Sequence, residues 1–123
     1  MDAASTSPTP WIDERLCYLT TTGRRSGRPH TIEIWFAEHE GRLYILSGNQ
    51  HRSDWVQNVV ASPAVQLRAG RTTLAGNARL IDDAAEDALA RRLLAAKYQG
   101  WSEGQPLSEW ARTATPVRID LAG

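Results

Sequence analysis

The chain of 123 residues has one cysteine, Cys17, which excludes an internal disulfide and a multi-cysteine metal site. We expect Cys17 to lie in a strand as a small buried hydrophobe. Long apolar runs are missing as well, because no segment approaches the roughly 18 residues of a membrane-spanning helix. His30, His39 and His51 show no metal-ligand spacing. The sequence therefore predicts neither a metal site nor a membrane span.

A net charge of one sign is also absent, since 14 Lys and Arg residues balance 14 Asp and Glu residues. Proteins that bind nucleic acid usually carry a basic excess, so we expect no nucleic-acid partner. Lysine itself is nearly absent, and all but one of the basic residues are arginine. Arginine favours planar, bidentate recognition of phosphate or carboxylate groups.

The first ten residues lack both basic residues and an apolar run, and they are rich in Ala, Ser, Thr and Pro. We expect residues 1–10 to be a flexible tail rather than a signal peptide. The remaining residues, 11–123, suffice for one domain with a modest core. We expect a soluble protein of the cytoplasm.

Short segments rich in β-branched and aromatic residues predict six strands, which are residues 16–22, 30–38, 43–47, 64–68, 72–81 and 115–121. A short helix should begin at Ser53 or Asp54 and end near Ala61. A second should begin near Asp83, which has capping-box spacing to Glu86, and run to residues 98–99. Its predicted apolar stripe consists of Ala85, Leu89, Leu93 and Ala96. Residues 107–111 add a possible helical turn, and the whole pattern predicts a barrel or a strongly curved sheet.

The most informative segment is residues 20–29, Thr-Thr-Thr-Gly-Arg-Arg-Ser-Gly-Arg-Pro. It predicts a strand that breaks into a loop with two glycines and three arginines. A structural hairpin needs glycine at such a place, but it does not need three arginines. We expect backbone N–H groups, hydroxyls and guanidinium groups to converge there on an anionic ligand.

A second loop, residues 47–54, connects a predicted strand end to a helix N-terminus, where free N–H groups favour an anion. It matches no P-loop or dinucleotide fingerprint, so a plain connection is the alternative. Five tryptophans accompany these loops. Trp55 is expected in the core, and Trp35 shares the predicted face of its strand with Glu33. That face suits a flat ring or a partner subunit.

Three motifs taken together resemble the deazaflavin-dependent nitroreductase family. They are Leu19 to Pro29, the strand Leu43 to Gly48 followed by Asp54-Trp55-Val56-Gln57-Asn58, and Ala61-Ser62-Pro63-Ala64-Val65. The resemblance covers roughly residues 16–68. It implies a mainly β, α+β fold: a six-stranded split β-barrel of the FMN-binding type with two or three flanking helices.

The resemblance also implies binding of reduced coenzyme F-420, an 8-hydroxy-5-deazaflavin with a phosphodiester and an oligoglutamate tail. Catalytic roles would fall to Ser47, as a hydroxyl donor, and to Tyr98, on the substrate side. The residues implied in cofactor binding are Thr21, Gly23, Arg24, Arg25, Ser26, Gly27, Glu33, Ile34, Trp35, Ser47, Gly48, Asn49, Gln50, Arg52, Trp55 and Asn58.

The leading hypothesis is therefore an oxidoreductase that passes a hydride from F-420 to a small electron-poor acceptor, such as a quinone, an enone or a nitro compound. In such chemistry the cofactor supplies the reactivity, and the protein positions the ring and excludes water. The alternatives are a non-catalytic carrier of a flavin, a deazaflavin or haem, and an FMN-dependent reductase. Since barrels of this type commonly dimerise, we expect a homodimer.

Overall fold

The computed structural model describes residues 10–48 and 53–122. A short 3-10 helix, η1 (Trp11–Asp13), opens the described chain. The strands are β1 (Cys17–Thr22), β2 (Pro29–Ile34), β3 (Ala37–His39), β4 (Arg42–Ser47), β5 (Ala64–Ala69), β6 (Thr72–Leu80) and β7 (Thr115–Leu121). The helices are α2 (Asp54–Ala61), α3 (Ala84–Gln99) and α4 (Glu109–Thr113).

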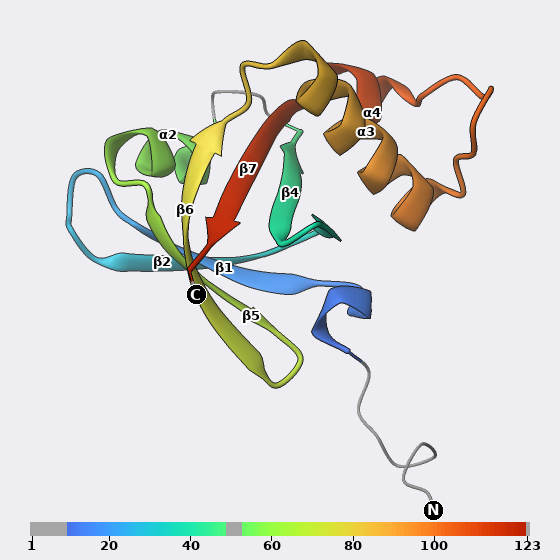
Figure 1. Ribbon diagram of the computed structural model, residues 1–123. Coiled ribbons are helices and arrows are strands. Elements are labelled where there is room, and N and C mark those ends of the chain that lie inside the picture. Colours follow the sequence, from blue (N-terminus) through green and yellow to red (C-terminus); the bar gives the residue numbers. More distant parts are fainter. Residues whose placement is uncertain (1–9, 49–52, 123) are drawn as a thin grey trace, which may run out of the picture.

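All these strands form one antiparallel sheet in the order β2-β1-β5-β6-β7-β4-β3. β2 and β3 follow each other in the chain, yet they stand at opposite ends of this order. The two residues between them, Trp35 and Phe36, therefore carry the chain across the opening of a curled sheet (Figure 1). The split-barrel prediction is confirmed. The strand expected over residues 30–38 is two strands, so the sheet has seven strands rather than six.

The inside of the curled sheet holds the main core. Alternation along each strand sends every second side chain inward, as in β5, where Val65, Leu67 and Ala69 are buried and their neighbours are exposed. Cys17 lies in this core, as expected, and burial raises the pKa of its thiol to about 12. A thiol that stays protonated is a poor nucleophile, so Cys17 offers no thiolate chemistry.

Helix α3 packs on the outside of the sheet, over β4 (Figure 1). β4 is buried on both faces, because Leu43 and Ile45 point into the barrel while Tyr44 and Leu46 pack under α3. The predicted stripe of this helix is wrong in part: Ala85 and Ala96 are exposed, and Leu89 and Leu93 are half-buried. The fully buried positions are instead Ala90, Leu94 and Ala95. Alanine is common on several faces of this helix, so apolar spacing alone did not single out the packed face.

The helix ends follow the predictions closely. α2 begins after Ser53 and packs Trp55, Val56 and Val59 into the barrel core. α3 begins after Asp83, whose carboxylate accepts a hydrogen bond from Glu86 N at 2.8 Å. None of the helices within residues 10–48 and 53–122 is long and apolar enough to cross a membrane.

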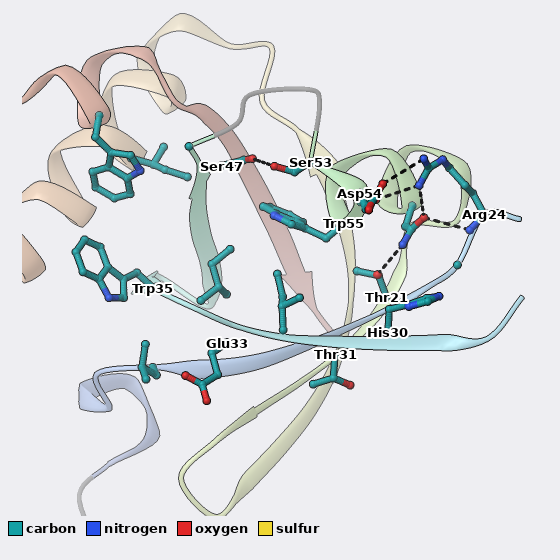
Figure 2. Close-up of a pocket in the computed structure, with 18 of the residues that line it drawn as sticks. Thr21, Arg24, His30, Thr31, Glu33, Trp35, Ser47, Ser53, Asp54 and Trp55 are labelled. Carbon is teal, nitrogen blue, oxygen red and sulfur yellow. Dashed lines mark hydrogen bonds and ion pairs between the residues drawn. The ribbon is translucent and has the colours of Figure 1, made fainter. Parts of the chain in front are cut away.

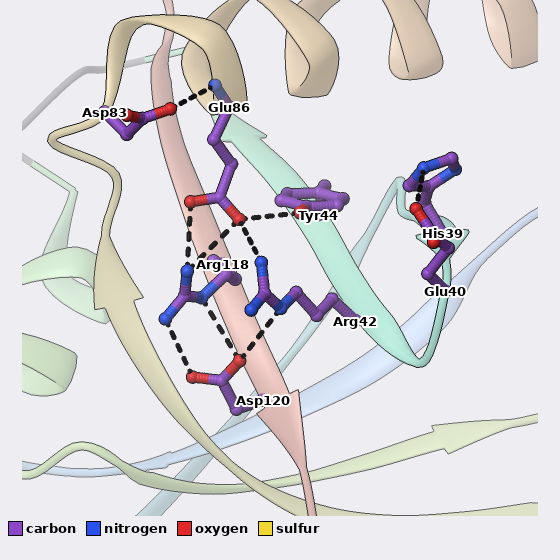
Figure 3. A network of polar contacts seen from close by, with 8 residues as sticks. All are labelled: His39, Glu40, Arg42, Tyr44, Asp83, Glu86, Arg118 and Asp120. Carbon is purple, nitrogen blue, oxygen red and sulfur yellow. Dashed lines mark hydrogen bonds and ion pairs between the residues drawn. The ribbon is translucent and has the colours of Figure 1, made fainter.

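A polar network fastens α3 to the sheet at its first turn. Glu86 accepts hydrogen bonds from the Tyr44 hydroxyl at 2.7 Å, from Arg42 at 3.1 Å and from Arg118 at 3.0 Å (Figure 3). Arg118 also pairs with Asp120, with 3.1 Å between Nε and Oδ1. Glu86 and Arg118 are largely buried. Buried charges are tolerated when they are paired and hydrogen-bonded in this way.

Candidate functional site

A cavity of about 1210 Å³ opens beside β2, between the β1–β2 loop, α2, the end of β4, the last turn of α3 and the first turn of α4. Its lining changes from polar to aromatic along its length: Arg24 and His30 lie at one end and Trp35 at the other, with Trp55 between them (Figure 2). It is lined by Leu16, Thr21, Gly23, Arg24, Arg25, Ser26, His30, Thr31, Ile32, Glu33, Ile34, Trp35, Leu46, Ser47, Gly48, Ser53, Asp54, Trp55, Asn58, Gln99 and Trp110.

At the polar end, one buried side chain fixes the arginine loop to α2. The Asn58 amide donates to the Thr21 hydroxyl at 3.2 Å, while its oxygen accepts from Arg24 N at 3.1 Å and from Arg24 Nη1 at 2.9 Å. The Arg24 guanidinium also pairs with the Asp54 carboxylate at 3.4 Å. The loop is therefore held in place before any ligand arrives.

These contacts change the expected role of Arg24. Its guanidinium holds the loop to α2, which leaves less of it for an anionic ligand. Arg25 also lines the cavity, is exposed, and makes no hydrogen bond or ion pair within the described part of the chain. Arg25 is thus the cation better placed to meet an anion.

The backbone of the loop is also less available than the sequence predicted. Gly23 N donates to Arg28 O at 2.8 Å, and Gly27 N donates to Gly23 O at 2.9 Å. Arg28 N donates to the Ser26 hydroxyl at 3.1 Å. Most of the N–H groups therefore stabilise the turn itself, so recognition of an anion there would depend on side chains.

Gly23 lies close to two side chains. A Cβ at this position would lie 2.7 Å from His30 Nε2 and 2.7 Å from Ser26 Oγ, which is closer than real Cβ atoms come to such atoms. Glycine therefore lets the His30 ring and the Ser26 hydroxyl lie over the start of the loop.

At the other end, three aromatic side chains pack together, and two of them, Trp35 and Trp110, line the cavity. Trp35 stacks on Tyr98 with ring centroids 4.4 Å apart and planes 3° apart, and Trp110 meets Trp35 edge-on at 5.4 Å. Trp35 is 39% exposed and lines the cavity. Glu33 lies on the rim and points away from Trp55 (Figure 2). Because β2 ends at Ile34, Glu33 and Trp35 do not share a strand face as predicted.

Between the two ends, the end of β4 contributes Ser47 and Gly48. The buried Ser47 hydroxyl lies 2.7 Å from the Ser53 hydroxyl at the start of α2. A Cβ at Gly48 would lie 3.4 Å from the Trp110 indole nitrogen. The two serines thus join the end of β4 to the start of α2 beside the cavity.

Most residues implied in cofactor binding line this one cavity, although they come from four separate segments. Gly27 does not line it; this residue turns the loop at a φ of 72°. Asn49, Gln50 and Arg52 lie outside the described residues. Tyr98 does not line the cavity either, because its hydroxyl is bonded to the backbone of Phe36 and Arg15.

Several lining residues were missed. Ile32 could have been found, since it shares a strand face with Ile34 by the period of two. Ser53 and Asp54 were predicted as the helix start and as part of the 47–54 loop, without a binding role of their own. Gln99 is the last residue of α3, and Trp110 lies in the first turn of α4. Both are far in sequence from the other lining residues, and no local pattern indicates that they line the cavity. Among the described residues, no group of three or more His, Cys, Asp and Glu side chains is placed to hold a metal ion.

Comparisons with solved structures identify the fold. An F420-H2 dependent reductase superimposes with a TM-score of 0.67 at 22% identity, over 85% of this chain and 93% of that one. A domain-swapped dimer matches with a TM-score of 0.67 at 23% identity, over 85% and 79%. A FAD-binding protein from Mesorhizobium loti matches with a TM-score of 0.64 at 18% identity, over 92% and 85%. At these identities the likeness concerns the fold.

The family follows from the sequence itself. A family model for the F420H(2)-dependent quinone reductases matches residues 3–121, which is nearly the whole chain. This agrees with the predicted resemblance to deazaflavin-dependent reductases and favours a reductase over a non-catalytic carrier. The chain belongs to the F420H(2)-dependent quinone reductase family, and it is a deazaflavin-dependent oxidoreductase.

Proposed function

We propose that this protein binds reduced coenzyme F-420 in the cavity beside β2 and passes a hydride to a quinone, with enones and nitro compounds as further acceptors. The observation that carries the proposal is the division of a single cavity into a polar end with an exposed arginine and an aromatic end. Because the chain matches a family of F420H(2)-dependent reductases, we assign the polar end to the charged part of the coenzyme and the aromatic end to its ring.

The cavity suits the coenzyme in size and in chemistry. Ligand pockets usually measure about 300–1,000 Å³, and this one, at about 1210 Å³, has room for a cofactor together with a small acceptor. A deazaflavin has a flat ring at one end and negative charge at the other. The wall of Trp35 and Trp55 matches the ring, and Arg25 and His30 match the charged end.

Each group of residues then has a separate task. The reduced coenzyme supplies the hydride when bound, so the protein needs no nucleophile of its own. Ile34, Trp35 and Trp55 present apolar surface that would orient the ring and exclude water. The Ser47 hydroxyl, which is buried and oriented by Ser53, would donate a hydrogen bond to a carbonyl oxygen of the ring or of the acceptor.

The decisive experiment is a pair of titrations of the purified protein, with F-420 and with FMN, followed by quenching of tryptophan fluorescence. We expect F-420 to bind more tightly than FMN. Oxidation of the bound reduced coenzyme after addition of a quinone would then establish turnover. Tighter binding of FMN would support the FMN-dependent alternative instead.

The role of Arg25 is tested by replacing it with alanine. Loss of a charged hydrogen bond should weaken binding of F-420 by about 1.5–3 kcal/mol, which is roughly 10- to 150-fold. Arg71→Ala is the matched control, since it removes an exposed arginine from the β5–β6 turn, outside the cavity lining. Equal affinities of the two variants would refute the assignment of Arg25.

A further inference from the structure

The break between β2 and β3 leaves the backbone N–H and C=O groups of Phe36 without sheet partners, and side chains of α3 bind both. Phe36 N donates to the Tyr98 hydroxyl at 3.1 Å. Phe36 O accepts from Lys97 Nζ at 2.9 Å and lies 3.0 Å from the same Tyr98 hydroxyl. Two consecutive residues in the last turn of α3 therefore hold both backbone polar groups of Phe36.

The same two residues also tie this bend to the start of the described chain. Lys97 Nζ donates to Ile12 O at 3.2 Å and lies 3.8 Å from the centre of the Phe36 ring. The Tyr98 hydroxyl lies 2.9 Å from Arg15 O, and the Arg15 guanidinium lies 4.7 Å from the centre of the Tyr98 ring. Burial lowers the pKa of Lys97, as expected for an ammonium held among apolar rings and carbonyl groups.

The bend between β2 and β3 consists of Trp35 and Phe36. It affects the cavity because Trp35 lines that cavity. The Trp35 indole lies flat on the Tyr98 ring, 4.4 Å away, and Trp110 packs edge-on against it. Tyr98 thus fixes Trp35 twice: its hydroxyl holds the neighbouring peptide, and its ring sets the plane of the indole. Tyr98 itself does not reach the cavity, whereas Trp35 does.

We propose that Tyr98 and Lys97 are positioning residues, which fix the plane of Trp35 as the end wall of the cavity and act on the bound ligand only through that indole. This differs from the role expected for Tyr98 as a residue on the substrate side. That the ligand is F-420 rests on the proposed function.

The test is a double-mutant cycle with Trp35→Leu, Tyr98→Leu and both together, which measures the dissociation constant of F-420. An aromatic stack is worth about 0.5–1.5 kcal/mol, so each single change should weaken binding roughly two- to tenfold. Because Tyr98 acts through Trp35, the double variant should bind about as weakly as Trp35→Leu alone. If the increases in dissociation constant of the two single variants multiplied in the double variant, the two residues would act independently, and the proposal would be overturned.

The conservative variant Tyr98→Phe separates positioning from chemistry. It keeps the ring stack and removes the hydroxyl, so it should recover most of the affinity lost in Tyr98→Leu and leave the pH profile of kcat unchanged. A Tyr98→Phe protein that binds F-420 normally but loses kcat would show that the hydroxyl acts on the substrate, and the proposal would fail. The matched control is Tyr18→Phe, which removes a tyrosine hydroxyl outside the cavity lining.

Near-ultraviolet circular dichroism of the ligand-free protein gives a readout that does not depend on F-420. Trp35→Leu should remove the signal of the stacked Trp35–Tyr98 pair, and Tyr98→Leu should remove the same signal. Lys97→Met should reduce it, because the bend loses one of its two anchors. If F-420 does not bind to the wild-type protein, the proposed function fails, yet these spectra still decide whether Tyr98 and Lys97 fix the plane of Trp35. Unchanged spectra in Tyr98→Leu and Lys97→Met would overturn it.

Discussion

Asn58 joins three parts of the site with one side chain. Only 4% of it is exposed, and its amide group pairs with β1 through Thr21 and with the β1–β2 loop through Arg24. Its own position on α2 is fixed by Trp55 and Val59, which pack into the core on the same helix. The geometry of the arginine loop therefore depends on Asn58 as well as on Arg24.

Replacement of Asn58 by alanine should destabilise the protein. The Thr21 hydroxyl and Arg24 N would lose their partner, and an unsatisfied buried polar group costs about 1–3 kcal/mol. The free energy of unfolding in urea measures the change. Gln66→Ala is the control, since Gln66 is an exposed amide on β5 and should change stability by less than about 0.5 kcal/mol. Equal stability of the two variants would show that the Asn58 contacts contribute little.

Adjacent arginines with the same chemistry can have different functions. Arg24 and Arg25 are neighbours in the loop, and the sequence predicted one role for both. The fold turns Arg24 toward Asn58 and Asp54, whereas Arg25 lies at the cavity without such a partner among the described residues. Which arginine can serve a ligand was decided by the location of α2, and no local pattern contains that information.

At the scale of the elements, the attachment of α3 determines the aromatic end of the cavity. Its first turn is fixed to β4 and β7 through Glu86, and its last turn holds the bend between β2 and β3 through Lys97 and Tyr98. A helix fastened at both ends can hold Trp35 in one plane. Loss of the contacts at either end of α3 should therefore change the position of Trp35 in the cavity.

The stability of this attachment should depend on pH. Burial alone would raise the pKa of Glu86, but the hydrogen bonds from Tyr44 and Arg118 and the nearby arginine charges outweigh it, and the pKa lies below its ordinary value of 4.5. The folded protein thus binds this proton less readily than the unfolded chain. The stabilisation is complete above that ordinary value and is lost as the pH falls through the lowered pKa.

Denaturation curves measured at a series of pH values from about 6 to 3 test this expectation. The wild-type protein should lose stability toward the acid end more steeply than Glu86→Gln, which carries no titrating carboxyl at this site. Asp87→Asn serves as the control, because among the described residues Asp87 forms its ion pair with Arg91, one turn along the same helix, and not with the sheet. An identical pH dependence of wild type and Glu86→Gln would contradict the assignment.

At the scale of the whole molecule, we expect a homodimer. Trp35 and Leu16 are both more than one third exposed and both line the cavity, so apolar surface lies open around it. Light scattering after size-exclusion chromatography should give twice the mass of one chain. A single-chain mass at micromolar concentration would refute the dimer.

The strands, the helix boundaries and most of the cavity lining could be predicted from sequence because each rests on a local signal. Alternation marks the strands, Asp83 and Glu86 mark a helix start, and the run around Arg24 marks the family. The break at Trp35 could not be predicted in this way. Residues 30–38 contain neither glycine nor proline and show the pattern of one continuous strand. The break arises because one chain segment must pair with both ends of the curled sheet.

The sequence by itself thus determined the family, the barrel and the residues that gather around the cavity, because motif, alternation and capping act over a few neighbouring residues. Only the tertiary structure decided what those residues are free to do. Arg24 and Tyr98 carry suitable groups for binding and catalysis, but Asn58, Asp54 and the backbone of Phe36 already occupy them. Those partners lie 30 or more residues away in the chain, and folding alone brings them within hydrogen-bond distance.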